Sequence, residues 1–516
     1  MANEVNMFNI KAIFNKNKKN VKNVKKTRSF KGASRTRFTS WLMSTFAPIN
    51  RDLESDLQTL IVRSRDLAKN NEIFRSHLNN MQKSIIGSQG FRLQSLVKNP
   101  DGTLNEEVNK EIEYAWWDYG KNMNGYISKC GQMGDIDLDV LILRTLVVDG
   151  EVFIRVDKNA KNPYGISFEL LDSLQIDITK KQNRTSTQNA IVMGVEIDQY
   201  NKPVNYYFRE ATVDNYQVGK LVKIPADEII HIYKHEFVGQ ARGYGDIVAS
   251  IDSLKQLDDY AVAELFAAKV SACQGIFYER NGSAQSGDML DANTTEEDQG
   301  VFVSELSPGE ASIVPTGYTV KSVTPTHPNT NFSGFVKSII RRIASSVGVS
   351  YNRLAHDYEA VNYSSLREAS LDEAKTYSDI QRFLIDNWKT IQYSLWLKSY
   401  VINSTSNLIK PSHFKTYLDF SFIPRKDDLF DAAKDIVAVE RRLKLGLTNP
   451  IMEIEARGND VDDVLDGWIK WNDMLKKRNI SFSDTEPLPL DVINQINEEI
   501  NHPEIVDESI SSSNDK

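Results

Sequence analysis

Two histidines four residues apart, His231 and His235, have a spacing that could do chemistry. On a helix this spacing turns two imidazoles toward one face, where they can bind Zn²⁺. Here both lie at the end of a strand pattern over residues 228–233, and no third ligand stands near them in the sequence. We therefore expect neither a metal site nor a cofactor.

A second set could supply a nucleophile, because His356 and Asp357 are adjacent and several serines lie near them. A Ser–His–Asp relay is recognised by geometry, however, and all these residues fall in one predicted loop. Three glycines precede a helix, Gly239, Gly243 and Gly245, but their spacing does not match the dinucleotide-binding fingerprint. A structural turn explains them better. The chain also lacks the Gly-x4-Gly-Lys-Ser/Thr phosphate loop of nucleotide-driven motors. No catalytic set emerges, so we expect a protein that is not an enzyme.

The chain is organised around a long helix predicted over residues 246–274. Asp246 stands at the N-cap position and Gly275 at the position of a left-handed C-cap. At 1.5 Å per residue the helix would be roughly 40 Å long, and it must pack on something along its length. Its predicted apolar face consists of Ile247, Ile251, Leu254, Leu257, Ala261, Leu265, Ala268 and Ala272.

Composition limits the class of protein. A chain of 516 residues exceeds one hydrophobic core, and no apolar run is long enough for a membrane span or a secretory signal. With only Cys130 and Cys273, both expected to be buried, disulfide stapling is not expected. Residues 1–40 hold eleven Lys/Arg against the single acid Glu4, although the whole chain has a net charge of −8. A basic arm thus precedes an acidic body.

Hydrophobic periodicity predicts a helix-rich, mixed α+β fold. Trp116, Trp117, Trp388 and Trp396 fit helix faces and are expected in the core. A loop is predicted at 349–363. Helical patterns cover 53–86, 105–128, 135–148, 332–347, 364–402 and 427–475, and strand patterns cover 151–156, 166–171, 191–197, 205–208, 228–233, 276–278, 301–303, 311–314, 319–322 and 417–423.

Several local strings, in this order, resemble the lambda-type phage portal proteins over about residues 55–475. The strings are 149–153 (DGEVF), 231–233 (HIY), 239–243 (GQARG), 344–351 (ASSVGVSY), 362–367 (NYSSLR), 446–448 (GLT) and 458–460 (GND). Each string is short, but their number and order make the resemblance specific.

The resemblance implies a portal-type fold assembled as a ring, with two antiparallel stem helices and a small α/β clip. The implied division is a basic disordered arm (1–45), a wing (46–245 and 364–426), stem helices (246–274 and 331–348), a clip (275–330), a tunnel loop (349–363), a helical crown (427–485) and an acidic flexible tail (486–516).

Members of this family form a ring, normally of twelve copies, at one capsid vertex. The resemblance therefore implies a component of the virion, assembled in the host cytoplasm and without a membrane. Its implied partners are further copies of the chain, double-stranded DNA in the channel, terminase, the major capsid and scaffold proteins, and head-completion or adaptor proteins.

Charged residues of the stem and tunnel loop are the candidates nearest to DNA. An acidic body repels phosphate, which suits a conduit, because affinity rises steeply with each phosphate that is neutralised. Arg242 and Arg367 could serve a subunit interface, an intrachain ion pair or DNA. The stem candidates are Lys255, Lys269, Lys337, Arg341 and Arg342, and the tunnel-loop candidates are Arg353, His356, Asp357, Tyr358 and Glu359.

A different class of function remains open from the sequence. The basic arm could instead make the chain a DNA-processing enzyme or a non-catalytic nucleic-acid-binding protein. The absence of a phosphate loop and the helix–insert–helix order favour the conduit.

Overall fold

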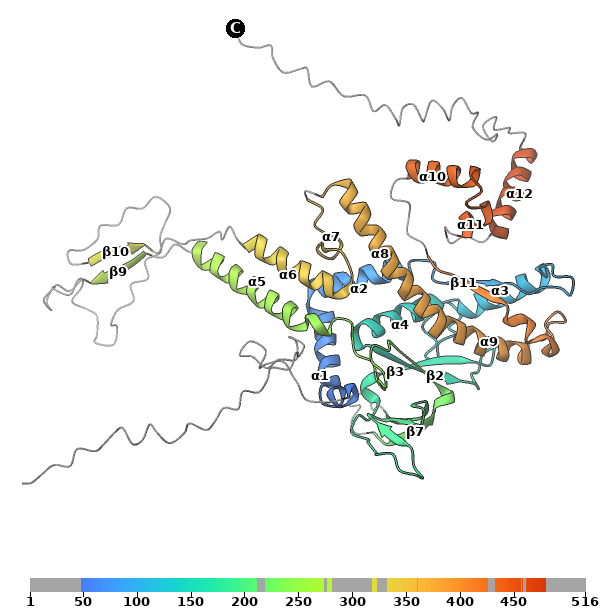
Figure 1. The fold of residues 1–516 in the computed structure, drawn as a ribbon, viewed down its shortest axis with the longest axis horizontal. Coiled ribbons are helices and arrows are strands. Elements are labelled where there is room, and N and C mark those ends of the chain that lie inside the picture. Colours follow the sequence, from blue (N-terminus) through green and yellow to red (C-terminus); the bar gives the residue numbers. More distant parts are fainter. Residues whose placement is uncertain are drawn as a thin grey trace, which may run out of the picture.

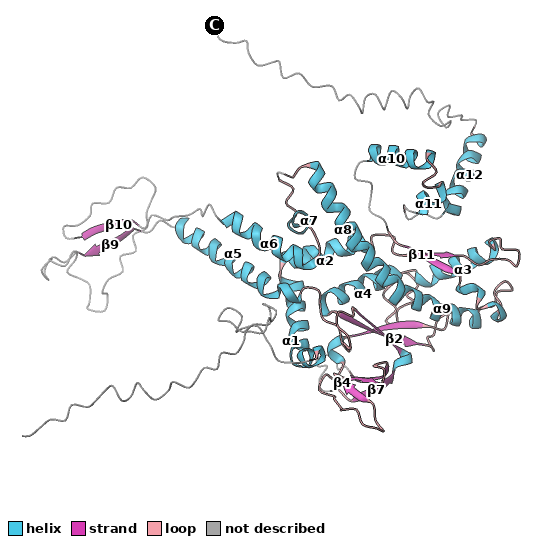
Figure 2. Cartoon of the chain, viewed as in Figure 1, coloured by secondary structure: helices cyan, strands magenta, loops and turns pink. Residues whose placement is uncertain are grey.

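The computed structural model describes residues 48–210, 219–272, 276–280, 318–322, 332–359, 361–425, 432–455, 457 and 461–478. In these residues helices dominate and short antiparallel sheets lie between them (Figure 1, Figure 2). The predicted helix-rich, mixed α+β class is confirmed.

Most of the body is helical. Figure 1 shows one helix pair, α5 and α6, extending side by side away from it, and α10–α12 forming a separate group beyond β11. The body helices are α1 (Ile49–Asn70), α2 (Glu72–Ile85), α3 (Glu106–Gly120), α4 (Asp135–Asp149), α8 (Tyr363–Leu384) and α9 (Thr390–Asn403). The others are α5 (Ile251–Ala272), α6 (Phe332–Val347), α7 (Tyr351–Ala355), α10 (Ala432–Lys444), α11 (Pro450–Glu455) and α12 (Val461–Lys477).

Four small antiparallel sheets accompany these helices. In the first, β2 (Glu151–Asp157) lies between β3 (Ser167–Leu171) and β8 (Ile229–Tyr233). The second is a meander of β4 (Ala190–Val192), β5 (Val195–Ile197), β6 (Pro203–Arg209) and β7 (Leu221–Pro225). The remaining pairs are β1 (Arg92–Ser95) with β11 (Phe420–Ile423), and β9 (Ile276–Arg280) with β10 (Tyr318–Ser322).

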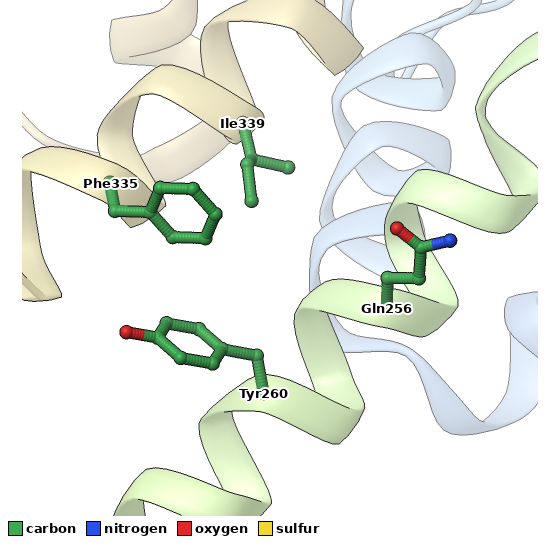
Figure 3. Close-up of a pocket in the computed structure, with 4 residues that line it drawn as sticks. All are labelled: Gln256, Tyr260, Phe335 and Ile339. Atoms are coloured by element: carbon green, nitrogen blue, oxygen red, sulfur yellow. The ribbon is translucent and has the colours of Figure 1, made fainter.

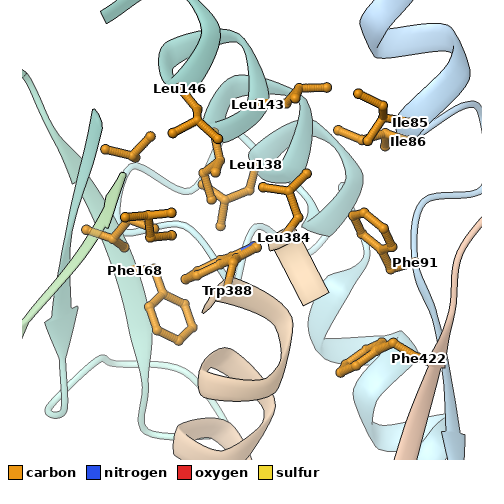
Figure 4. Close-up of a cluster of buried hydrophobic side chains, with 14 of the residues drawn as sticks. Ile85, Ile86, Phe91, Leu138, Leu143, Leu146, Phe168, Leu384, Trp388 and Phe422 are labelled. Atoms are coloured by element: carbon orange, nitrogen blue, oxygen red, sulfur yellow. The ribbon is translucent and has the colours of Figure 1, made fainter. Parts of the chain in front are cut away.

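One large hydrophobic core joins the body helices to β2 and β3, and it reaches the near ends of α5 and α6. Trp388 lies within it beside Leu138 and Leu384, with its ring edge-on to Phe168 at 5.2 Å (Figure 4). Trp116 and Trp396 are also buried, as predicted. The prediction for Trp117 is wrong, because its side chain is 60% exposed and Lys121 lies over its ring. Neighbours on a helix point about 100° apart, so only one of Trp116 and Trp117 faces the core.

Three predicted helices are interrupted, and one of them, 427–475, is divided into α10, α11 and α12. The helical pattern over 53–86 breaks at Asn71, whose side chain accepts a hydrogen bond from the Phe74 amide and so caps α2. The pattern over 364–402 contains a turn of π-helix, Ile385–Lys389, between α8 and α9. The Lys389 ammonium is fully buried there and lies 2.7 Å from Asp135 of α4.

The strand predictions were less accurate than those for helices. Residues 191–197 are not one strand but two, β4 and β5, joined by a turn in which Met193 and Gly194 have positive φ. Neither β1 nor β7 was predicted. The prediction that Cys130 is buried is wrong, because it is exposed. Predicted strands at 301–303 and 311–314, as well as Cys273, the arm 1–45 and the tail 486–516, lie outside the described residues.

Candidate functional site

The near ends of α5 and α6 are set into the body. Leu254 and Leu257 of α5 and Ile343 of α6 are buried in the main core. Asp246 does not cap the helix as predicted, because its carboxylate binds Lys234 at 2.6 Å and a short 3-10 turn, Val248–Ser250, precedes α5. The ordered α-helix is therefore shorter at its start than the sequence suggested.

The far half of α5 lies outside the core. From Tyr260 to Ala272 only Glu264 and Lys269 carry charge, so apolar residues face several directions. A helix that is apolar on all sides is normally buried on all sides. Here Val262, Leu265 and Phe266 are 68%, 57% and 67% exposed. Leu265 was predicted on the packed apolar face of the helix, and this prediction is wrong. The sequence analysis did not identify Val262 and Phe266 as exposed apolar residues, because they lie outside the predicted apolar face.

A cavity of about 450 Å³ lies at the seam between α5 and α6 (Figure 3). It is lined by Gln256 and Tyr260 of α5 and by Phe335 and Ile339 of α6. The Tyr260 ring meets Phe335 edge-on at 5.3 Å, and half of the Phe335 side chain remains exposed. The seam is thus an apolar, aromatic hollow open to solvent.

Most basic candidates on the two helices have local partners. Lys255 binds Asp259 at 2.9 Å, and the Arg342 guanidinium donates to the Ser253 hydroxyl at 2.5 Å. Similarly, Lys337 binds Asp357 at 2.9 Å, and Arg341 lies over the Tyr351 ring. Lys269 is exposed. Apart from Lys269, these cations therefore belong to small local pairs.

Residues 349–363 are not the loop that was predicted, because Tyr351–Ala355 form helix α7. The Ser350 side chain accepts a hydrogen bond from the Arg353 amide and caps it, and His356 ends it with a φ of 51°. Five residues are too short to show a helical period, which explains the error.

Two of the tunnel-loop candidates hold α7 against the body. The Arg353 guanidinium binds Glu373 of α8 at 3.1 Å and also contacts Ser84 of α2. His356 Nε2 lies 3.0 Å from the Ser76 hydroxyl. Consequently the Arg353 side chain is turned toward its own chain.

Asp357 is held by Tyr351 and Lys337. The Tyr351 hydroxyl donates to it at 2.7 Å, and this bond together with the Lys337 ammonium lowers the pKa of Asp357 to about 2. Its carboxylate thus binds Tyr351 and Lys337 instead of His356, so Ser76, His356 and Asp357 are not arranged as a catalytic relay. Beyond it, Tyr358 and Glu359 are exposed.

One buried cluster brings together three of the strings, 149–153, 231–233 and 239–243. Arg242 Nε lies 2.8 and 2.9 Å from the two Glu151 carboxylate oxygens, and Nη1 donates to the Met193 carbonyl. His231 Nε2 lies 3.2 Å from Glu151. Burial lowers the pKa of His231. Burial alone would raise the pKa of Glu151, but Arg242 and His231 outweigh it and lower that pKa to about 2.

Two glycines of this cluster are required because other backbone atoms lie too close to leave room for a Cβ. Gly150 has a φ of 88°, and a Cβ there would overlap the backbone of Tyr244, while a Cβ on Gly243 would overlap the Gly150 carbonyl. Next to them, Arg65 binds Asp149 and Asp172. These strings therefore hold the fold together, and Glu151, as the partner of Arg242, was missed by the sequence analysis.

The remaining sequence candidates occupy structural positions. The His235 ring lies tilted against the Tyr233 ring at 4.3 Å, and among the described residues no group of three or more His, Cys, Asp or Glu could hold a metal ion. Gly239 has a φ of 78° in an open turn. Arg367 lies half-buried on α8. Of the helices that the structure describes, none has the length and apolar character needed to cross a membrane.

Comparison with known proteins gives a consistent result. The family model described as "Phage portal protein, lambda family" matches residues 34–381. The chain is 31% identical over 445 residues to a "Probable portal protein" of Halomonas phage phiHAP-1, covering 85% of both chains. It is also 21% identical over 439 residues to "Portal protein B" of Escherichia phage lambda, covering 78% of this chain and 81% of that one.

Among solved structures, the chain resembles one titled "Neck of native GTA particle computed with C12 symmetry". The two are 13% identical with a TM-score of 0.44, over 78% of this chain and 94% of that one.

Proposed function

The chain belongs to the lambda family of phage portal proteins, and we propose that its copies close into a ring whose channel carries double-stranded DNA into and out of a capsid. The protein is then a non-catalytic component of the virion, located at one vertex and assembled in the host cytoplasm. It serves as a docking platform for terminase during packaging and for head-completion proteins afterwards.

The observation that carries the proposal is the far half of α5. It leaves Val262, Leu265 and Phe266 more than half exposed on a helix with little charge. Burying such side chains stabilises an association by about 1.5–3 kcal/mol each. A ring of α5–α6 pairs would cover them against neighbouring copies.

The charge pattern suits a channel through which DNA slides. The chain is acidic overall, with a net charge of −8. On the stem, Lys255 and Lys337 are paired with Asp259 and Asp357. Each cation that neutralises a phosphate raises DNA affinity, so locally paired cations keep the grip weak.

The element order supports the division of labour. Residues 246–274 and 331–348, containing α5 and α6, would surround the channel as stem helices. Residues 275–330 would form the clip that meets terminase, and 349–363 would lie nearest to DNA. The wing would comprise 46–245 and 364–426, and the crown 427–485 would face the capsid interior. Scaffold and major capsid proteins would be further partners of the ring.

The mass of the purified chain in solution, followed by negative-stain images, tests the ring. We expect a particle of roughly twelve subunits of 58.6 kDa with a central hole. Because assembly can depend on salt and scaffold, the measurement is repeated over a salt series and with the phage scaffold protein added. A chain that stays a monomer under all these conditions would contradict the proposal.

A further inference from the structure

The α5–α6 pair has two different apolar sides, and this inference rests on the proposed ring. One side is the seam with its cavity, where Tyr260 faces Phe335 (Figure 3). At about 100° per residue, Val262 and Leu265 lie about 160° and 140° round α5 from Tyr260. The exposed apolar residues therefore form a ridge on the side of α5 that faces away from α6.

The order of charged and apolar residues along the ridge matches their order along the seam. On the ridge, Asp259, Val262 and Phe266 follow an i, i+3, i+7 row, so an acid stands at the body end and apolar side chains stand beyond it. On the seam, Phe335, Ile339 and Arg342 follow an i, i+4, i+7 row of the antiparallel helix. Its basic residue therefore also stands at the body end.

We propose that the ridge of one copy packs into the seam of the next copy, with Val262 and Phe266 entering the cavity lined by Tyr260, Phe335 and Ile339. Asp259 then faces Arg342 of the neighbour. The Asp259 side chain is 65% exposed and binds Lys255, while Arg342 is exposed and donates to a neutral serine. The partner of Asp259 is exposed, while the partner of Arg342 is the buried Ser253 hydroxyl, which the guanidinium can keep while its other N–H groups bind the neighbour's carboxylate.

The difference between the two surfaces excludes a two-fold contact. Two surfaces of different kinds on one subunit make a head-to-tail contact, which forms a ring where the rotation between copies closes, whereas a two-fold dimer joins like surfaces. Val262 stands about one turn, roughly 6 Å, farther from the body than the middle of the cavity. Neighbouring pairs must therefore be inclined relative to each other.

Disulfide trapping tests the contact in a full-length chain in which Cys130 and Cys273 are replaced by serine. Val262→Cys and Phe335→Cys are placed in the same chain, and each is also made alone. Val262 faces away from α6 and Phe335 faces the seam, so α5 lies between them and they cannot join within one copy. After mild oxidation, denaturing non-reducing gels should show a ladder of multimers for the double variant only.

Mixtures distinguish the possible contacts. Copies with only Val262→Cys mixed with copies with only Phe335→Cys should form dimers and nothing larger. Cross-linking of either single variant to itself would show like surfaces in contact and overturn the inference. A ring of full mass without cross-links in the double variant would overturn the inference while leaving the proposed ring intact. Failure to form rings at all, with native folding by circular dichroism, would instead remove the proposed function.

Charge reversal gives a second measurement that does not depend on sulfur chemistry. Arg342→Glu alone and Asp259→Lys alone should each lower the assembled fraction several-fold, because each places like charges across the contact. The double variant should recover assembly. Equal assembly in all three variants would contradict the pairing of Asp259 with Arg342.

Discussion

Arg242 and Glu151 form an ion pair that water does not reach. The guanidinium is 1% exposed and the carboxylate is fully buried. This ion pair joins β2 to the segment that leads into α5. It therefore connects the body to the near end of the α5–α6 helix pair. Sequence alone left Arg242 open as an interface or DNA residue, and the geometry gives it an intrachain partner.

Arg242→Met should destabilise the fold by about 3–5 kcal/mol, because it leaves the Glu151 charge buried without its partner. The free energy of unfolding in urea, followed by tryptophan fluorescence, measures the loss. The control is Lys129→Met, which breaks the surface pair with Glu169, whose side chains are 42% and 34% exposed, and should cost less than about 1 kcal/mol. Equal losses in the two variants would mean that the buried pair contributes no more to the free energy of unfolding than the surface pair.

Gly150→Ala should be among the most damaging small substitutions. The new Cβ would meet the Tyr244 backbone at a residue with positive φ, and neither can move cheaply. We expect a loss of roughly 2–5 kcal/mol, seen as a lower urea midpoint or as insoluble protein. Gly334→Ala is the matched control, since nothing lies within 4 Å of its Cβ position on α6. That variant should gain about 0.5–1 kcal/mol.

Local patterns predicted much of the fold. Helix periods located most helices, because they depend on residues within a turn or two of one another, whereas the predicted cap Asp246 binds Lys234 instead. The pairing of β1 with β11 joins Arg92 to Ile423 and leaves no mark in either segment. Trp117 was misplaced for a related reason, since periodicity alone does not say which of two adjacent tryptophans faces the core.

The site was predictable by residue type and not by contact. The sequence identifies basic residues on the stem, but it does not show that Lys337 meets Asp357 or that Arg353 meets Glu373. Those pairs form only when α6, α7 and α8 are packed together. Likewise, the exposure of Val262 and Phe266 follows from the extension of α5 beyond the body, which no local pattern reveals.

His77 should make the protein less stable in mild acid. Burial lowers the pKa of this α2 histidine from 6.5 to about 4. Between these values the unfolded chain binds the proton and the folded chain does not, so stability falls as the pH falls from 6.5 to 4. The full effect is about 3 kcal/mol.

Urea unfolding measured from pH 7 to pH 4 tests this expectation. His77→Met should remove that part of the pH slope. Asn80→Met, which replaces a buried polar residue of the same helix that does not titrate, should shift the whole curve and keep its slope. A slope unchanged by His77→Met would refute the assignment.

Removing residues 1–40 separates the conduit from the alternative of an arm-driven nucleic-acid binder. The segment carries eleven Lys/Arg and one acid, and most of it precedes the family match, which begins at residue 34. We expect rings to form as in the full chain. Loss of DNA binding together with normal folding but no ring would favour the alternative. Particle mass and a DNA-binding assay over a salt series measure both outcomes.

The segment after α7 should affect DNA rather than assembly. Deleting residues 355–360 should leave rings intact and impair DNA packaging or retention, because Tyr358 and Glu359 are exposed there. Tyr358→Ala with Glu359→Ala should reproduce part of this defect without changing stability. Arg353→Ala, in contrast, removes the contacts with Glu373 and Ser84 and should lower stability by about 1–3 kcal/mol. Packaged DNA protected from nuclease, compared with the urea midpoint of each variant, distinguishes the two roles. Normal packaging by the deletion variant would show that this segment does not act on DNA.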